Sequence, residues 1–279
     1  MAIVSKGSGG SIKFTGTGGG ISITSSGGGG GGGGFNPSSL GNLSAWYKAA
    51  SLSLSNGATV TSIADSSGTG NDMTSYGGTP IYNASDAQFG GKPSISLNGS
   101  SYLYKDYAAG LPAGSEAWTI YAVGYANSSL FGIGGNSNGR AVRVNLYGDS
   151  GSGAYYADYC NITPGGPAYG STSSPVVLSI SKPGGAWPAN LITSVSFYCN
   201  NVLGTTGGEG YEGSLPSQNG GFGVTPAHTT IGTLPGAPTF WPAWGTGKFA
   251  EALVYNTQHD NTARLQVTQY LATKYGISI

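Results

Sequence analysis

The stretch WTIYAVGY, residues 118–125, decides the fold, because it is a short run of β-branched and aromatic residues without a helical period. Similar runs recur along the chain, separated by pieces rich in Gly, Pro, Asn and Ser. The predicted strands lie at residues 44–49, 93–99, 118–125, 141–148, 176–181, 191–200 and 249–256. Short strands at this density predict an all-β protein, an antiparallel two-sheet sandwich or jelly roll.

One helix is predicted, over residues 258–275 near the end of the chain. Asn256 or Thr257 is the expected cap, and Asp260 favours the first turn. Gly276 is expected at the position that ends the helix, and residues 277–279 are expected to form a short strand. The helical stripe consists of Ala263, Val267, Tyr270, Leu271 and Lys274.

The composition is rich in glycine and poor in charge, with 52 Gly and 8% charged residues among 279. The glycines are not periodic, which excludes collagen, and 11% aromatic residues argue against disorder. Eleven basic residues balance eleven acidic ones without a basic run, so no nucleic-acid partner is expected. No apolar stretch reaches the length of a membrane helix or of a signal-peptide core, so neither membrane association nor export is expected.

The first residues predict a separate arm. Residues 1–26 contain two alternating, strand-like pieces whose apolar positions are Ile12 and Phe14, then Ile21 and Ile23. A hairpin of this size is marginal alone, so we expect these four residues to anchor the arm to a partner. The run Gly27–Gly34 is the linker, and residues 35–279 form the predicted globular domain.

Both ends of that domain resemble concanavalin A-like, LamG-like domains, which are common in phage virion proteins and bacterial surface proteins. The resemblance rests on LSAWYKA with DSSGTGND, on the strand ending Leu97-Asn98-Gly99, and on the final segment FAEALVYN…YLATKYG. The matching positions near the start are Leu43, Trp46, Ala49, Asp65, Ser67, Gly68, Gly70 and Asn71. The resemblance implies a two-sheet jelly roll and suggests a virion, assembled in a host cytoplasm, as its location.

The segment DSSGTGND admits two interpretations. Asp65, Asn71 and Asp72 supply oxygens of the kind that Ca²⁺ prefers, which makes them a weak candidate metal site. The alternative is a tight turn in which these side chains bond nearby amides, with Gly at positive φ. The turn is the favoured interpretation, and no cofactor is expected.

Catalytic signals are weak. The closely spaced Glu-x-Asp-x-x-Glu strand motif of glycosidases is absent, and the nearest carboxylate pair, Glu209 and Glu212, lies in a glycine-rich segment. His228 and His259 stand in no hydrolase motif, and His259 is expected in the first turn of the helix. No enzymatic activity is therefore predicted.

Aromatic and cysteine residues are the remaining candidates. Tyr155, Tyr156 and Tyr159, with Trp241 and Trp244, would suit sugar stacking or a protein interface, or else pack beneath loops. Trp46 and Trp118 lie in predicted strands and are expected in the core. Cys160 and Cys199 are either buried thiols or a disulfide.

These observations predict a non-catalytic phage virion protein, first of all a capsid decoration (cement) protein anchored by its arm. Its expected partners are a major capsid or tail protein and further copies of itself, a trimer being suited to a capsid or fibre. Two alternatives stay open: a lectin-like tail-fibre or receptor-binding module that recognises host surface carbohydrate, and an enzyme that degrades polysaccharide.

Overall fold

The chain divides into two units, Met1–Asn36 and Pro37–Ile279, and every described helix and strand belongs to the second unit. Of the described residues, those between 134 and 168, together with Tyr76 and His228, are described by their backbone alone. The computed structural model describes residues 34–105, 110–112, 116–127, 129–137, 140–149, 154–159, 165–168, 173–184, 196–204, 228–232 and 246–279.

Eight strands form one antiparallel sheet, named sheet A here, in the order β14-β13-β12-β7-β16-β5-β4, with β1 also paired to β16. Strand β16 is long enough to pair with β5 along its first half and with β1 along its second half. The strands are β1 (Leu43–Lys48), β4 (Ile81–Asp86), β5 (Lys92–Asn98), β7 (Trp118–Ala126), β12 (Val176–Lys182), β13 (Ser196–Cys199), β14 (Val202–Leu203) and β16 (Thr246–Tyr255).

Eight further strands form a second antiparallel sheet, sheet B, in the order β11-β10-β9-β8-β15-β6-β3-β2. These strands are β2 (Ser62–Ile63), β3 (Met73–Gly77), β6 (Tyr102–Lys105), β8 (Ser129–Ser137), β9 (Arg140–Asp149), β10 (Ala154–Tyr159), β11 (Gly165–Ala168) and β15 (His228–Ile231). The helical elements are the 3₁₀ turns η1 (Pro37–Leu40), η2 (Ala49–Ser51) and η3 (Ala87–Phe89) and the α-helix α1 (Asn261–Tyr275).

The hydrophobic core lies between the two sheets. It combines Ile95 and Ile120 of sheet A with Leu103 and Ile133 of sheet B, all fully buried. A strand exposes alternate residues to opposite faces, so a sheet that packs on one side only should alternate apolar and polar residues. The two-sheet antiparallel sandwich predicted from the sequence is confirmed.

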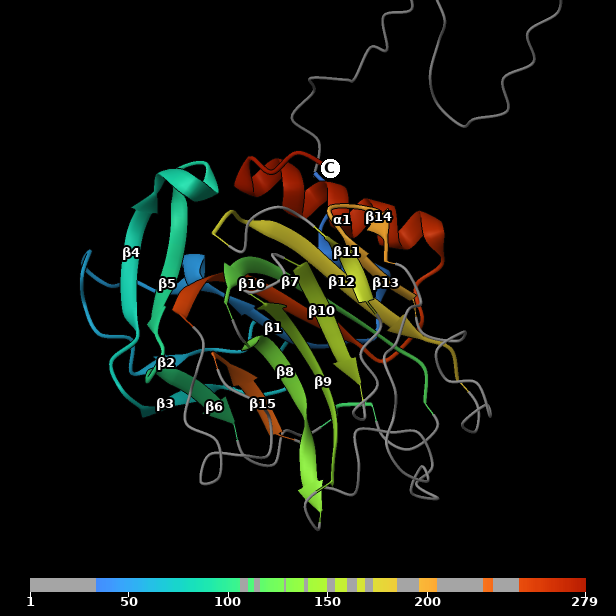
Figure 1. Cartoon of the computed structure of the whole chain (residues 1–279), viewed down its shortest axis with the longest axis horizontal. Coiled ribbons are helices and arrows are strands. Elements are labelled where there is room, and N and C mark those ends of the chain that lie inside the picture. The colour runs from blue at the N-terminus through green and yellow to red at the C-terminus, as the bar shows by residue number, and fades with distance from the viewer. Residues whose placement is uncertain are drawn as a thin grey trace, which may run out of the picture. The chain divides into compact units, whose positions relative to one another are not determined.

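Strand β7 is buried on both faces, which explains why WTIYAVGY does not alternate between apolar and polar residues. Trp118 and Ile120 belong to the core between the sheets. Tyr121 and Val123 alternate with them and are fully buried on the outer face of sheet A, which is the face turned away from sheet B. Helix α1 lies on this outer face, beside β4 and β5 and not over them (Figure 1).

Helix α1 begins later than the sequence predicted. Asp260 caps it, because its carboxylate accepts a hydrogen bond of 2.8 Å from the Ala263 amide. Asn256 and Thr257 were the wrong choice. The Thr119 hydroxyl donates to the Thr257 carbonyl and accepts from the backbone N–H of residue 259, so this segment is held against β7 before the helix can start.

The end of α1 follows the prediction only in part. Gly276 has φ 66° and its N–H donates to the Ala272 carbonyl, as expected for a glycine that ends a helix. Residues 277–279 form no strand, because the Ile277 N–H also returns to Ala272. The predicted stripe is right for Val267 and Leu271. The buried face is Arg264, Val267, Thr268, Leu271, Ala272 and Tyr275.

A β-bulge in β16 decides which side chains reach the outer face. Phe249 pairs with Gly124 of β7 and Glu251 pairs with Val123, so Ala250 is an extra residue. Lys248 and Glu251 are three residues apart and would point to opposite faces of a regular strand. The bulge places both on the outer face, while Phe249 fills the core.

Glu251 ties α1 to sheet A. Its carboxylate is fully buried and accepts hydrogen bonds from Trp46 Nε1 at 2.6 Å, Lys274 Nζ at 2.6 Å and Tyr275 Oη at 2.7 Å. The donors come from β1 and from the last turn of α1. A buried carboxylate is tolerated only when it is paired and hydrogen-bonded in this way.

In the described part of the chain no helix is long and apolar enough to span a membrane.

Replacement of Glu251 by Ala should destabilise the fold by about 3–5 kcal/mol, because three donors lose their acceptor, namely the buried Trp46 and Tyr275 and the partly buried ammonium of Lys274. The matched variant Tyr275→Phe removes a single donor and should cost about 1.5–3 kcal/mol. Urea unfolding followed by tryptophan fluorescence measures both. A Glu251→Ala cost no larger than that of Tyr275→Phe would contradict the anchoring role.

Candidate functional site

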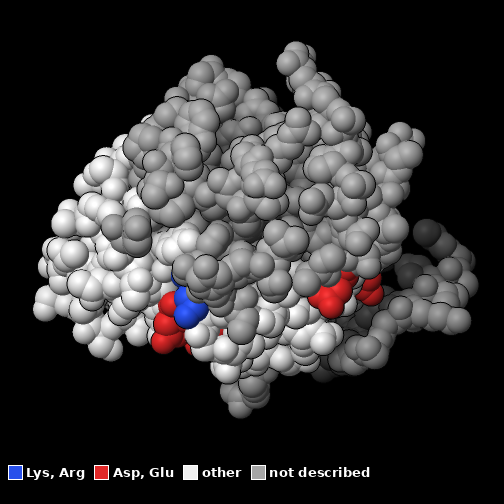
Figure 2. All heavy atoms as spheres, turned by 90° about the horizontal axis from the view of Figure 1, so that it is seen from below, with Lys and Arg blue, Asp and Glu red and all other residues white. Residues whose placement is uncertain are grey.

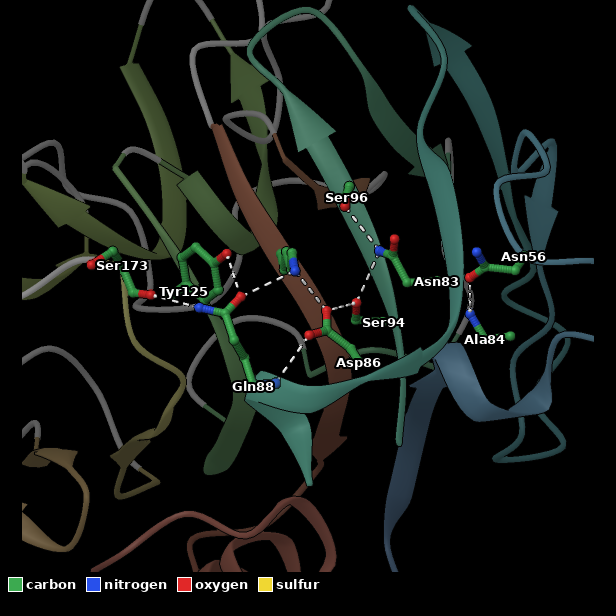
Figure 3. A network of polar contacts seen from close by, with 10 residues as sticks. Asn56, Asn83, Ala84, Asp86, Gln88, Ser94, Ser96, Tyr125 and Ser173 are labelled. Carbon is green, nitrogen blue, oxygen red and sulfur yellow. Dashed lines mark hydrogen bonds and ion pairs between the residues drawn. The ribbon is translucent and has the colours of Figure 1, made fainter. Parts of the chain in front are cut away.

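A connected set of polar side chains lies on the outer face of sheet A, on the half that α1 leaves open (Figure 3). We call it the outer-face polar network. Strands β4, β5, β7 and β16 and the turn η3 supply it. Its members are Asn83, Asp86, Gln88, Ser94, Ser96, Tyr125 and Lys248.

An ion pair forms the centre of this network. The Asp86 carboxylate lies 2.8 Å from Lys248 Nζ. It also accepts hydrogen bonds from the Ser94 hydroxyl at 2.7 Å and from the backbone N–H of Gln88 at 3.1 Å. Burial by itself raises the pKa of Asp86, but the three donors and the positive charge of Lys248 outweigh it and lower that pKa below its usual value. Asp86 is therefore ionised and its charge is balanced locally.

Gln88 extends the network towards β7. Its Oε1 atom accepts hydrogen bonds from Tyr125 Oη and Lys248 Nζ, both at 3.0 Å, and its Nε2 donates to the Ser173 carbonyl at 3.3 Å. The Tyr125 ring stacks on Phe89 with 6.3 Å between ring centroids. Gln88 is exposed, but these contacts fix the direction of its amide.

Asn83 ends the network on β4. Its Nδ2 donates to both Ser94 Oγ at 3.0 Å and Ser96 Oγ at 2.9 Å, which orients the side-chain amide. No donor among the described residues bonds Asn83 Oδ1, and Figure 3 shows this oxygen without a contact. Ser96 accepts from Asn83, so its own hydroxyl hydrogen remains available. Both side chains are only partly buried, so an acceptor and a donor stand side by side towards solvent.

The sequence contains a pattern that indicates this network and that was not among the predictions. In the predicted strand at residues 93–99, Ser94 and Ser96 alternate with the core residues Ile95 and Leu97. Such alternation marks one polar face, and that face is where the network lies. The alternation of residues along β16 does not predict that Lys248 belongs to this network, because the bulge in β16 breaks the period of two.

The segment DSSGTGND forms a turn around Asp65. The Asp65 carboxylate accepts hydrogen bonds from the Trp46, Ser67 and Asn71 amides and from the Ser67 and Thr69 hydroxyls, at 2.7–3.1 Å. Burial raises the pKa of Asp65, and these donors lower it further than burial raises it. Asp72 accepts from the Asp65 amide at 2.8 Å. Within the described ranges, no group of three or more His, Cys, Asp or Glu residues could hold a metal ion.

His259 lies just before the cap of α1 and not in its first turn, where the sequence placed it. Its Nδ1 is 2.8 Å from the Tyr121 hydroxyl, and its ring lies 4.2 Å from the centre of the Tyr255 ring. Nε2 is buried and bonds to none of the described residues. Burial lowers the pKa of His259 to about 4, although Asp260 opposes this shift.

Of the remaining sequence candidates, Trp118 lies in the core as expected. Trp46 is buried instead on the outer face, where it contacts Glu251. Cys199 is a buried thiol, and burial raises its pKa. Tyr155, Tyr156 and Tyr159 belong to β10, whose side chains are not described. The candidates wholly outside the described residues are Ile12, Phe14, Ile21, Ile23, Cys160, Glu209, Glu212, Trp241 and Trp244.

No family model matches the chain, and neither does any curated protein. Solved structures do match. An arabinofuranosidase complexed with arabinofuranosyl-α-1,2-xylobiose aligns with 86% of this chain at 15% identity and a TM-score of 0.56. A Trypanosoma rangeli sialidase in complex with sialic acid aligns with 85% at 12% identity and a TM-score of 0.50. The chain spans 64% of the arabinofuranosidase and 34% of the sialidase.

A third structure matches along almost its whole length. Domain 4 of AbnA, a GH43 extracellular arabinanase from Geobacillus stearothermophilus, in complex with arabinotriose, is covered to 98% by 83% of this chain. The identity is 18% and the TM-score 0.50. At these identities the likeness establishes a shared β-sandwich of the kind found in glycoside hydrolases.

These matches correct two predictions made from the sequence. The expectation of a non-catalytic phage capsid decoration protein is contradicted, because the matching structures described above are glycoside hydrolases and a glycan-bound domain of one. The expectation that the chain has no enzymatic role is contradicted by the same structures. The resemblance to domains common in phage virion proteins misled, because one fold serves proteins of many different functions.

Replacement of Asp65 by Asn should destabilise the fold by about 2–3 kcal/mol, because an amide NH₂ would face donors that now bond a carboxylate oxygen. The matched variant Asp72→Asn affects an exposed carboxylate that accepts a hydrogen bond from the Asp65 backbone N–H, and it should cost less than about 1 kcal/mol. Guanidinium unfolding measures both. Equal costs for the two variants would contradict the central role of Asp65 in the turn.

The free energy of unfolding should fall as the pH is lowered from about 6.5 to about 4. In this range the unfolded chain binds a proton at residue 259 and the native state does not, so protonation favours unfolding by up to about 3 kcal/mol. Asp65 and Asp86 have lowered pKa values and act mainly below this range. Urea unfolding at several pH values measures the slope, and His259→Gln should flatten it. An unchanged slope in that variant would contradict the assignment.

Proposed function

We propose that the second unit, Pro37–Ile279, is a carbohydrate-active domain that binds a polysaccharide chain containing pentose sugars. The observation that carries this proposal is the match to the arabinotriose-bound domain of AbnA, which this chain covers almost completely. Sites and not folds determine function, so the match needs support from the surface itself.

The outer-face polar network supplies that support. Sugars are recognised by oriented donors and acceptors, because each hydroxyl both donates and accepts a hydrogen bond. Amides, hydroxyls and one balanced ion pair are the groups that the network presents, and internal bonds fix their directions. Figure 2 shows that charge is sparse on the described part of the surface seen from below, where basic atoms lie against acidic ones in one small spot and a second small spot is acidic.

Hydrolysis of such a polysaccharide is the second candidate function. It is favoured by the arabinofuranosidase match, whose TM-score of 0.56 exceeds that of the AbnA domain. Glycoside hydrolysis uses two carboxyl groups that flank the bond. Asp86 and Glu251 each form an ion pair with a lysine, Lys248 and Lys274 respectively, and Glu251 is fully buried. The pair chosen for testing is Glu209 and Glu212, because these two glutamates stand three positions apart in the sequence.

The relation of this sandwich to a particular family of β-sandwich domains is also a proposal. We infer that the sandwich is a concanavalin A-like, LamG-like jelly roll, and one contact supports this. The two family-like segments near the start meet in the structure, because the Trp46 backbone N–H donates to Asp65 and the Asn71 side-chain amide donates to the Ser44 carbonyl. The matching residues thus build one joint between β1 and the turn that ends at Asn71.

The test is binding and hydrolysis by the full chain. Incubated with insoluble arabinoxylan and with debranched arabinan, the protein should sediment with at least one of them, while heat-unfolded protein should not. Reducing-sugar release from the same samples separates an enzyme from a binding domain. If release occurs, the Glu209→Gln/Glu212→Gln variant tests that pair.

Sedimentation without sugar release would support the binding function and contradict hydrolysis of these two polysaccharides. Release that persists in the double variant would exclude Glu209 and Glu212 as the essential pair. If neither polysaccharide is bound or cleaved at millimolar sugar concentrations, the proposed function is wrong.

A further inference from the structure

We propose that Asn83, Ser96 and Lys248 form a subsite for a neutral sugar on the open half of the outer face of sheet A. This inference rests on the proposed function, and it names both the place and the class of sugar. The three residues lie on the adjacent strands β4, β5 and β16.

The register of the strands brings these residues together. Lys248 is directly opposite Ser96, and Asn83 is opposite Ser94, its neighbour by two residues on β5. Strands lie about 4.8 Å apart, and alternate residues of one strand lie about 6.8 Å apart on the same face. The subsite therefore has the dimensions of a short oligosaccharide segment, and it lies on a sheet and not on a loop.

The hydrogen-bond directions leave complementary groups at the surface. Both hydrogens of Asn83 Nδ2 are donated inward, to Ser94 and Ser96, so Oδ1 is the group left to accept. Ser96 has a hydroxyl hydrogen left to donate. Lys248 gives two of its three hydrogens to Asp86 and Gln88, and its side chain is 25% exposed. An acceptor beside two donors fits neighbouring hydroxyl groups of a sugar ring.

The charges of the subsite select a neutral sugar. An anionic sugar such as sialic acid would need a cation that is not already paired. Lys248 lies 2.8 Å from the Asp86 carboxylate, whose lowered pKa keeps it ionised, so the pair carries no net charge. Drawing Lys248 away towards a sugar carboxylate would leave a nearly buried Asp86 uncompensated, which is costly.

Preorganisation strengthens the subsite. A flexible polar surface loses side-chain freedom when it binds, and this loss opposes affinity. Here the amide of Asn83 and the ammonium of Lys248 are already held by internal hydrogen bonds. The chain Lys248–Asp86–Ser94–Asn83–Ser96 runs without a break across three strands (Figure 3).

The experiment titrates the full chain with arabinotriose and, separately, with sialic acid. Calorimetry gives the dissociation constants, and the side-chain amide signals of Asn83 and Gln88 in nitrogen–proton NMR spectra report where binding occurs. Arabinotriose should shift both amide signals, and sialic acid should not. Asn83→Leu and Ser96→Ala should weaken arabinotriose binding at least tenfold and at least threefold.

The control is Ser85→Ala, which removes an exposed hydroxyl from the same strand β4 and should bind as the unchanged protein does. Variants are compared only where their thermal unfolding matches that of the unchanged chain. If Asn83→Leu does not fold, the NMR titration of the unchanged chain decides alone.

The outcomes separate this inference from the proposed function. Arabinotriose binding that leaves the Asn83 and Gln88 amide signals in place would overturn the subsite, while the glycan-binding function would stand. Sialic acid binding at these signals would overturn the choice of a neutral sugar. Absence of binding to arabinotriose by a chain that sediments with neither polysaccharide would overturn both.

Discussion

The buried carboxylate of Glu251 is the interaction on which the arrangement of the outer face depends. It accepts hydrogen bonds from Trp46, Lys274 and Tyr275, and so it joins β16 to β1 and to the last turn of α1. An ion pair of this kind contributes little net stability compared with an apolar contact, but leaving any partner alone is costly. The bonds that Lys274 and Tyr275 donate to Glu251 hold the last turn of α1 at one place on sheet A. The apolar residues Val267 and Leu271 then supply most of the attraction in that position.

That position divides the outer face of sheet A into two halves. Under α1 the outer side chains of β7 are apolar or aromatic, as Tyr121 and Val123 show. Beyond the end of α1, on β4 and β5, they are Asn83, Ser94 and Ser96. The bulge at Ala250 serves both halves, because it sends Glu251 towards the helix and Lys248 towards the open network. One extra residue therefore couples the anchoring of the helix to the formation of the polar surface.

The sequence predicted the parts of the fold that depend on local patterns. Strands β1, β5, β7, β9, β12 and β16 lie where runs of apolar residues predicted them, and Gly276 ends the helix as expected. It missed β2 and β14, which are two residues long and carry no pattern of their own. It also missed longer strands such as β4 and β8; β8 contains three glycines, a residue type that is uncommon in strands. It also misplaced the cap of α1, since the choice of Asp260 depends on the hydrogen bond that the backbone N–H of His259 donates to Thr119, far away in sequence.

The candidate site shows the same limit more strongly. The pairing of Asp86 with Lys248 spans 162 positions and requires both the antiparallel register of β4, β5 and β16 and the bulge. The candidate metal ligands Asp65, Asn71 and Asp72 lie close together along the chain, yet the Asp65 carboxylate accepts its hydrogen bonds from protein donors. Proximity in sequence favours turns, which satisfy their own polar groups. A surface that binds a ligand needs groups left unsatisfied, and in a β-sandwich these arise where strands from distant parts of the chain meet.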